Sequence, residues 1–300
     1  MNLLIIGSTG FIGSHLFSRL STKYNCYGAD IINKENVNNY FLLKRDDVDY
    51  DNLFKNNHFD VCINASGAAS VSESFLKPDY DMKLNVMNVE KILECIRKYQ
   101  RNCHFITLSS AAVYGNPVRI PIKESDSLFP ISPYGLHKMF SEEICKLYTN
   151  LFDIKTTCVR IFSAYGDGLK KQLLWDVLNK FLYEDEIEIY GSGNESRDFI
   201  HINDIVEAIA LIINNVHSGF NIFNIANGEE IAVKYIVSSI KECLNSDRKI
   251  IFNNKNRAGD PLNWQADISK IRDLGYRKTV TIEQGIISYV SWAKCKVDYK

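Results

Sequence analysis

A glycine-rich turn close to the N-terminus constrains the fold of this chain more than any other feature. The apolar run Leu3–Ile6 predicts a buried strand, and a helical pattern ends near Leu20. Between them lies the segment Gly7-Ser8-Thr9-Gly10-Phe11-Ile12-Gly13, with the spacing G-x-x-G-x-x-G. Such a turn lets the backbone approach a pyrophosphate, whose charge the helix N-terminus stabilises. We expect Gly7, Gly10, Phe11, Ile12 and Gly13 to bind a dinucleotide; the alternative is a glycine-rich turn without a ligand.

An acidic residue follows the second predicted strand, Cys26–Ala29. Asp30 lies 20 residues after Gly10, where a carboxylate accepts hydrogen bonds from the ribose hydroxyls of adenosine. A carboxylate would also repel the 2′-phosphate of NADP, so the sequence favours NAD over NADP, a preference that Lys34 could soften. The alternative is a solvated loop aspartate.

A second acidic and apolar pair follows the next predicted strand, Tyr40–Leu43. Asp47 and Val48 offer a polar and an apolar side chain that could hold the adenine. The alternative is a charged turn.

Strand and helix patterns alternate over about 160 residues. The later strands are predicted at Val61–Asn64, His104–Leu108 and Lys155–Ile161, and the helices at Tyr80–Lys98 and from Pro133 to about Leu151. This alternation predicts an α/β fold with a doubly wound parallel (Rossmann) sheet in residues 1–166. Residues 167–300 have a looser pattern and predict a smaller mixed α/β lobe that mainly binds substrate, with about 199–225 returning to the Rossmann sheet.

The segment Ser132-Pro133-Tyr134-Gly135-Leu136-His137-Lys138 predicts the start of a helix. Ser132 is a favourable N-cap, and Pro133 suits the first helical position. Tyr134 and Lys138 then lie one turn apart on the same face. A phenol beside an ammonium group can exchange protons near neutral pH. The alternative is a surface tyrosine and an unrelated lysine, but the dinucleotide turn upstream favours a catalytic pair.

Composition and charge exclude several classes of protein. The net charge is −1, which predicts neither nucleic-acid nor membrane binding. The eight cysteines are scattered without a C-x-x-C motif, which predicts reduced core thiols and no metal site. No apolar run reaches the ~18 residues of a membrane span, and the N-terminus is typical of a strand and not of a signal peptide. We therefore expect a cytoplasmic protein.

Five motifs together resemble the extended short-chain dehydrogenase/reductases. Three of them are the glycine turn, Ser110 four residues before Tyr114-Gly115, and Tyr134-x-x-x-Lys138. The other two narrow the resemblance to the nucleotide-sugar epimerase/dehydratase group: Arg197-Asp198-Phe199-Ile200-His201-Ile202-Asn203-Asp204 and Arg257-Ala258-Gly259-Asp260. The resemblance covers essentially the whole chain.

The resemblance implies three catalytic residues. Tyr134 would be the general acid/base at a sugar hydroxyl. Lys138 would bind the nicotinamide ribose and lower the Tyr134 pKa. Ser110 would hydrogen-bond the same sugar oxygen, with Ser109 as its rival.

It also implies residues that bind the substrate. Arg197 and Arg257 would clamp the nucleotide diphosphate, and Asp260 would hold the ribose of the nucleotide. The alternatives are an ion pair between Arg197 and Asp198 and a solvated charge at Arg257. His201 has apolar neighbours and is expected to be a core residue and not a catalyst.

Departures from the family pattern separate its subclasses. The 4,6-dehydratases carry an Asp-Glu pair where this chain has Ala111-Ala112, and methyl groups cannot catalyse the elimination of water. UDP-galactose 4-epimerases often carry a lysine and an asparagine where this chain has Ala69 and Ser163. These differences argue against UDP-galactose as the substrate, but they are compatible with a reaction at C4 of another sugar. We therefore expect hydride transfer at C4 by a nucleotide-sugar 4-epimerase. The alternatives are a 4-keto-6-deoxyhexose 4-reductase using NAD(P)H, a 4,6-dehydratase, and a catalytically idle NAD-binding regulator.

The resemblance also implies a homodimer formed through the helices at Tyr80–Lys98 and Pro133–Leu151.

Overall fold

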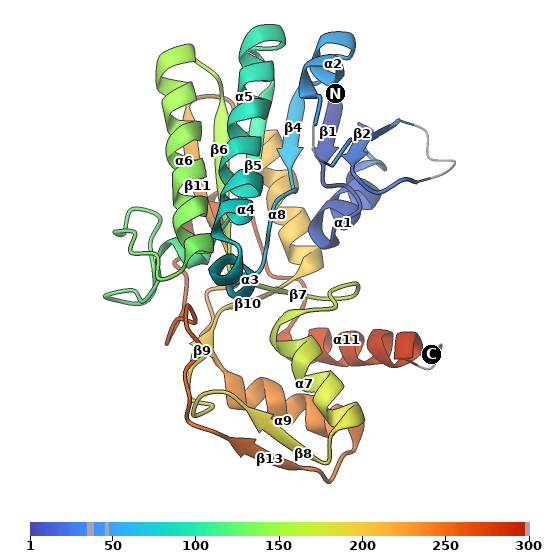
Figure 1. The fold of residues 1–300 in the computed structure, drawn as a ribbon, viewed down its shortest axis with the longest axis vertical. Helices are drawn as coiled ribbons and strands as arrows, with labels where there is room; N and C mark the ends of the chain where they lie inside the picture. The colour runs from blue at the N-terminus through green and yellow to red at the C-terminus, as the bar shows by residue number, and fades with distance from the viewer. Residues whose placement is uncertain (35–38, 46–47, 298–300) are drawn as a thin grey trace.

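A seven-stranded parallel sheet forms the larger part of the protein (Figure 1). The computed structural model describes residues 1–34, 39–45 and 48–297. The strand order is β11-β6-β5-β4-β1-β2-β3, with parallel pairing throughout. The strands are β1 (Asn2–Ile6), β2 (Asn25–Asp30), β3 (Tyr40–Leu42), β4 (Val61–Asn64), β5 (His104–Ser110), β6 (Thr156–Ile161) and β11 (Phe220–Ile225). The predicted α/β class and Rossmann sheet are therefore confirmed.

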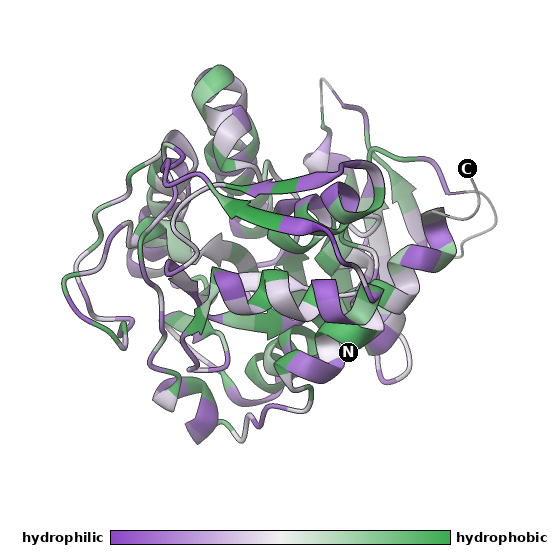
Figure 2. Cartoon of the chain, turned by 90° about the horizontal axis from the view of Figure 1, so that it is seen from below, coloured by the Kyte–Doolittle hydropathy of each residue, from purple (hydrophilic) through white to green (hydrophobic). Residues whose placement is uncertain are grey.

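Helices cover both faces of this sheet, because alternate residues of each strand point to opposite sides. Leu3 and Ile5 of β1 pack in one core with α1 (Phe11–Leu20) and α8 (Ile202–Asn215). Leu4 and Ile6 pack in a second core with α2 (Tyr50–Asn56), α5 (Asn88–Tyr99) and α6 (Pro133–Phe152). Figure 2 shows the hydrophobic residues recurring along the helices between hydrophilic ones. None of the helices within the described ranges has the length and apolar character needed to cross a membrane.

The helix predicted at Tyr80–Lys98 is divided in the structure. It consists of α4 (Pro78–Met82), the π-helical turn η1 (Lys83–Met87) and α5, and it is preceded by the short helix α3 (Val71–Leu76). A π turn inserts one residue into the helical repeat. Asp81 of α4 and Asn85 of the π turn are each 2% exposed, and both segments contact α6.

A smaller lobe lies beneath the carboxyl ends of the strands (Figure 1). Its elements are β8 (Glu186–Ile189) paired with β13 (Lys249–Phe252), and the helices α7 (Gln172–Tyr183), α9 (Val233–Leu244) and α11 (Ile282–Val297). These elements share a third apolar core.

Short elements connect the two parts of the chain. They are β7 (Ser163–Tyr165) paired with β10 (Phe199–His201), β9 (Ser196–Arg197) paired with β12 (Ile231–Ala232), the 3-10 turn η2 (Ala111–Val113) and α10 (Ser269–Asp273). Within the segment expected to return to the large sheet, β11 joins that sheet beside β6, whereas β10 pairs with β7 in a separate sheet. The division of the chain at residue 166 stays a prediction.

Candidate active site

The glycine turn holds the start of α1 tightly against the end of β1. Gly7 has a φ of 83°, and a Cβ there would lie 2.6 Å from the amide nitrogen of Ser66. A Cβ on Gly13 would lie 2.0 Å from the carbonyl oxygen of Gly7. Gly10 is the N-cap of α1 and has no side chain over the first turn, which begins at Phe11 and Ile12. This cradle fits a pyrophosphate, because it leaves the backbone and the positive end of the helix accessible.

Asp30 ends β2 next to this turn. Its Oδ2 accepts hydrogen bonds from the backbone nitrogen of Thr9 at 2.9 Å and from the Thr9 hydroxyl at 2.7 Å, which orients the carboxylate. That position and orientation fit a ribose. Asp47 lies outside the described residues. Val48 is partly buried against the core on the face of Leu4 and Ile6.

Serine side chains fix the start of α6. The Ser132 hydroxyl accepts a hydrogen bond from the Gly135 nitrogen at 3.1 Å, and the Ser74 hydroxyl of α3 accepts one from the Tyr134 nitrogen at 3.1 Å. Pro133 has no N–H to satisfy. The predicted helix start is therefore present, and its first turn faces α3, next to the segment that follows β4.

Tyr134 and Lys138 lie on one face of α6, as their spacing predicts. The Lys138 ammonium is 5.8 Å from the centre of the Tyr134 ring and donates a hydrogen bond of 2.8 Å to the Leu108 carbonyl. Burial lowers the pKa of Lys138 to about 8, against the opposing charges of Asp81, Glu142 and Cys158. The protonation of the buried Lys138 side chain therefore depends on the charged groups around it.

The pKa of Tyr134 moves in the direction opposite to the expected one. Burial raises the pKa of Tyr134 to about 12, the Ser110 hydroxyl opposes this by hydrogen bonding, and the charge of Asp81 adds to the rise. The Lys138 ammonium lies over the Tyr134 ring and donates its hydrogen bond to Leu108. The expectation that Lys138 would lower the Tyr134 pKa is therefore not met, since the net change is a rise caused mainly by burial.

The two serines at the end of β5 face different surroundings. The Ser109 hydroxyl is buried and donates to Glu142 Oε1 at 2.5 Å. The Ser110 side chain caps η2 by accepting a hydrogen bond from the Ala112 nitrogen at 3.1 Å, and it lies within hydrogen-bonding reach of Tyr134. Ser110 is therefore the serine that joins Tyr134 and Lys138.

The two arginines predicted to bind phosphate each lie over an aromatic ring. Arg197 is half-buried, 5.7 Å from the Trp264 ring centre, and donates to the Ser196 carbonyl at 2.8 Å. Arg257 lies 4.2 Å from the Tyr190 ring centre and 3.7 Å from the Asp176 carboxylate. Sequence reasoning missed both aromatic platforms; Tyr190 directly precedes the Gly191-Ser192-Gly193 turn, which was the only available signal.

Asp198 does not pair with its neighbour Arg197. Its carboxylate instead accepts hydrogen bonds from the backbone nitrogens of Asn227, Gly228 and Ala266, at 2.9, 2.9 and 3.0 Å. The alternative of an Arg197–Asp198 ion pair is thus wrong, and Asp198 holds three segments together beside the site. Asp260 is exposed. Burial lowers the pKa of Arg197, and the negative charges of Asp260 and Glu195 oppose this effect.

His201 is 6% exposed, and its Nδ1 accepts a hydrogen bond from the Asn203 nitrogen at the start of α8. It therefore occupies the core position that its apolar neighbours predict.

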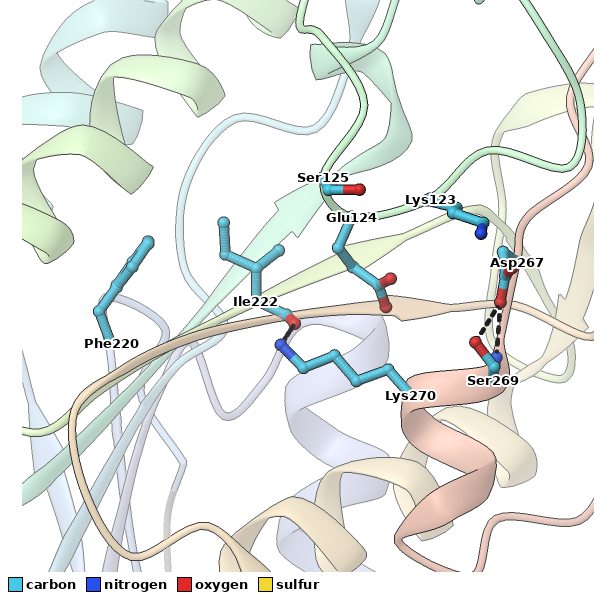
Figure 3. A pocket seen from close by; sticks show the side chains of 8 residues that line it. All are labelled: Lys123, Glu124, Ser125, Phe220, Ile222, Asp267, Ser269 and Lys270. Atoms are coloured by element: carbon cyan, nitrogen blue, oxygen red, sulfur yellow. Dashed lines mark hydrogen bonds between the residues drawn. The ribbon is translucent and has the colours of Figure 1, made fainter.

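A separate cavity of about 420 Å³ lies at the edge strand β11 (Figure 3). It is lined by Lys123, Glu124, Ser125, Phe220, Ile222, Asp267, Ser269 and Lys270, none of which is a predicted site residue. The Lys270 ammonium donates to the Ile222 carbonyl at 2.7 Å, and Glu124 accepts from the Asn224 nitrogen at 2.9 Å. These side chains satisfy polar groups of the edge strand, which accounts for their position.

The fold and the site together define a class of protein. A glycine turn after β1, a carboxylate after β2 and a Ser-Tyr-Lys set beside the same sheet edge are features of a Rossmann-type dinucleotide-binding oxidoreductase. The family model described as "NAD dependent epimerase/dehydratase family" matches residues 3–226. The chain therefore belongs to the NAD-dependent epimerase/dehydratase family, which confirms the resemblance.

Individual relatives are similar along their whole length. A putative UDP-glucose 4-epimerase of Methanocaldococcus jannaschii is 30% identical, and the match covers 97% of this chain and 98% of the relative. The UDP-N-acetylglucosamine 4-epimerase of Methanobrevibacter ruminantium M1, in complex with UDP-N-acetylmuramic acid, has a TM-score of 0.88 at 25% identity, covering 98% of both chains. The UDP-glucuronic acid 4-epimerase of Bacillus cereus, in complex with UDP-glucuronic acid and NAD, has a TM-score of 0.89 at 24% identity, covering 99% of this chain and 100% of that one.

Proposed function

We propose that this chain is an NAD-dependent 4-epimerase of a UDP-sugar. The observation that carries the proposal is the meeting of Ser110, Tyr134 and Lys138 at the sheet edge that also holds the glycine turn. Three relatives whose names specify 4-epimerases of UDP-sugars support the reaction and the nucleotide.

In this proposal Tyr134 moves the proton of the sugar C4 hydroxyl. When bound, NAD would supply the hydride acceptor and a positive charge. Tyr134 holds its proton in the protein alone, because burial raises its pKa to about 12. Positive charge near its oxygen favours the phenolate that accepts the hydroxyl proton, and Ser110 holds the sugar oxygen within reach.

The residues proposed to bind the nucleotide come from the smaller lobe and its connections. A Cβ on Gly259 would lie 2.6 Å from Val71 Cγ1 and 3.3 Å from Ser132 Cβ, so the loop carrying Arg257 and Asp260 packs beside the start of α6. This contact brings the loop close to Tyr134. We assign the diphosphate to Arg197 and Arg257, whose guanidinium groups suit phosphate oxygens, and the ribose of the nucleotide to Asp260.

The proposal also includes a homodimer. Side chains on the outer surface of α3 to α6 are apolar yet exposed: Leu76, Met82, Met87, Phe140, Leu147 and Leu151. α5 and α6 lie side by side on one face of the sheet (Figure 1). Exposed apolar side chains on neighbouring helices are typical of a subunit interface. The cytoplasmic location and the lack of nucleic-acid binding stay predictions.

The decisive experiment incubates the purified protein with UDP-glucose, UDP-glucuronic acid and UDP-N-acetylglucosamine separately. Proton NMR then follows the C4 epimer without added cofactor. We expect interconversion of at least one pair with no net change in NADH absorbance. Tyr134→Phe is expected to lose turnover by roughly 10²-fold or more, because the proton carrier is removed, while NAD is still retained.

Stoichiometric consumption of NADH by a 4-keto sugar would instead identify a 4-reductase. Conversion of none of these sugars, with NAD bound, would support the idle regulator.

A further inference from the structure

A buried polar cluster lies directly behind Tyr134 and Lys138. Asp81 Oδ1 accepts hydrogen bonds from His137 Nδ1 at 2.7 Å and from Asn85 Nδ2 at 3.0 Å. Asp81 and Asn85 are each 2% exposed, and His137 is 6% exposed. His137 precedes Lys138 on α6 and shares the face of Tyr134, so the cluster is part of the same helix surface as the candidate catalytic pair.

Two acceptor oxygens in this cluster have no donor within the described part of the chain. They are Asp81 Oδ2 and Asn85 Oδ1. Asn85 lies in the π turn, and its Oδ1 would be 2.5 Å from a Cβ on Gly67, in the segment after β4. A buried carboxylate with an incomplete set of hydrogen bonds is unfavourable for stability. Such a carboxylate, hydrogen-bonded to a residue of a π turn, is typical of a functional role.

The groups that oppose the lowering of the Lys138 pKa come from three elements. Burial lowers the Lys138 pKa, and Asp81 of α4, Glu142 of α6 and Cys158 of β6 oppose it, with Asp81 the largest of the three. Glu142 is paired with Arg160 at 2.6 Å, so much of its charge is compensated. The thiol of Cys158 is neutral at physiological pH, because burial raises its pKa well above the ordinary value. Asp81 is therefore the main counter-charge for Lys138.

We propose that Asp81 is a positioning residue for the Tyr134–Lys138 pair, in which its buried carboxylate, oriented by His137 and Asn85, balances the Lys138 ammonium. The Asp81 charge favours the protonated form of Lys138 and opposes the lowering of its pKa by burial. Asp81 also raises the pKa of Tyr134, because its negative charge disfavours the phenolate. Removal of this one carboxylate is therefore expected to lower the pKa of both groups. The inference rests on the proposed function, because Lys138 is taken to bind the nicotinamide ribose.

The test measures the affinity for NADH by its fluorescence between about pH 6 and about pH 10. In the wild-type protein the affinity is expected to fall as the pH rises through about 8, where Lys138 loses its proton. In Asp81→Asn the midpoint of this fall is expected about one pH unit lower, because a neutral amide no longer favours the ammonium. Asp79→Asn is the matched control, since it removes an exposed charge from the same helix and leaves the midpoint unchanged.

A second variant covers the case in which Asp81→Asn alone does not fold. Asp81→Asn with His137→Gln keeps a donor and an acceptor facing each other at these two positions, where neither side chain is charged. The midpoint of the pH dependence of NADH affinity in this double variant is expected to be lowered by the same amount as in Asp81→Asn. His137→Gln alone keeps the carboxylate and is expected to leave the midpoint within the range of the wild type.

The pH profile of kcat/KM with the UDP-sugar substrate gives a second measurement. Both limbs of the profile are expected to move to lower pH in Asp81→Asn, because Tyr134 and Lys138 both lose the same negative neighbour. A folded variant with reduced rates but an unmoved midpoint and unmoved limbs would overturn the inference and leave a structural role. Failure of the wild-type protein to bind NADH, or to convert any UDP-sugar, would instead overturn the proposed function.

Discussion

The two adjacent serines at the end of β5 differ in role although their sequence context is the same. Ser109 donates to Glu142, whereas Ser110 reaches Tyr134. The pleat of the strand points successive side chains to opposite faces, so only one of them can face the site. Sequence reasoning preferred Ser110 because of its distance from Tyr114, and its catalytic role stays a prediction.

We predict that alanine substitution of one serine lowers turnover and that alanine substitution of the other lowers stability. Ser110→Ala is expected to lower turnover by roughly 10²-fold with little loss of stability, because a donor to the sugar oxygen is removed. Ser109→Ala is expected to lower the free energy of unfolding by about 2 kcal/mol, because a hydrogen bond to a buried carboxylate is lost. Steady-state kinetics and urea unfolding of the two variants separate these effects; equal losses of turnover would contradict the assignment.

The strand–turn–helix unit at the N-terminus depends on glycine for a steric reason. A Cβ on Gly13 would lie 2.0 Å from the Gly7 carbonyl oxygen, whereas a Cβ on Gly10 would lie 3.3 Å from the same atom. The third glycine therefore permits α1 to start close to β1, and Gly10 leaves the first turn uncovered.

We predict that Gly13→Ala moves the turn and abolishes NAD retention. The clash is expected to lower the free energy of unfolding by about 1–3 kcal/mol. Gly10→Ala is the control for stability, because its contact of 3.3 Å needs only a small adjustment. Thermal unfolding and the NAD released on denaturation are the measurements. Normal NAD content in Gly13→Ala would show that the turn does not hold the cofactor.

A buried ion pair joins α6 to β6 behind the candidate catalytic residues. Glu142 and Arg160 are 2.6 Å apart, and both side chains are 2% exposed. Arg160 also donates to the Tyr114 hydroxyl at 2.8 Å, which in turn donates to Asn224 at 2.7 Å. This network connects α6, β6, β11 and the end of η2, and Ser109 of β5 donates to Glu142, so it fixes the helix that carries Tyr134 and Lys138.

Removal of one partner of this pair is expected to be severe. Arg160→Met leaves the Glu142 charge buried and uncompensated, and we predict a loss of about 3–5 kcal/mol in the free energy of unfolding. Arg19→Met is the matched control: the side chains of Arg19 and Glu207 are 64% and 39% exposed, so about 0–1 kcal/mol is expected there. Urea unfolding measures both. A similar small loss in the two variants would show that the buried pair contributes little.

The proposed dimer surface is formed by side chains of several helices, so it exists only in the folded molecule. Leu147 and Leu151 of α6 are 50% and 65% exposed, and Met82 and Met87 lie on the neighbouring helical segments at 42% and 48%. In the chain alone these apolar side chains are in contact with water, which is unfavourable.

We predict that Leu147→Glu yields a monomer. A charge at the centre of an apolar interface must be desolvated without a partner, which opposes association. Tyr183→Glu is the control, because Tyr183 is 65% exposed on α7 in the smaller lobe. Light scattering of the two variants and the wild type gives the mass. A wild-type protein that is already monomeric at micromolar concentration would contradict the dimer.

The order of strands and helices was largely predictable, because burial repeats every two or every three to four residues in the sequence. α2 and α3 were missed, although each has an N-cap signal: the Asp49 side chain accepts from the Asn52 nitrogen, and the Ser70 side chain accepts from the Glu73 nitrogen. The π turn at Lys83–Met87 was also missed, since the hydrophobic repeat on either side of it is that of an ordinary α-helix.

The amino-acid sequence determined the local features: the glycine turn, the capped start of α6 and the spacing that puts Tyr134 and Lys138 on one face. These features depend on residues at most a few positions apart, where backbone geometry leaves few choices. Only the tertiary structure brought Asp81 to His137, which lies 56 positions away, and buried Lys138 so that its pKa falls to about 8. Burial and charge depend on which distant segments pack together, and no local pattern specifies that packing.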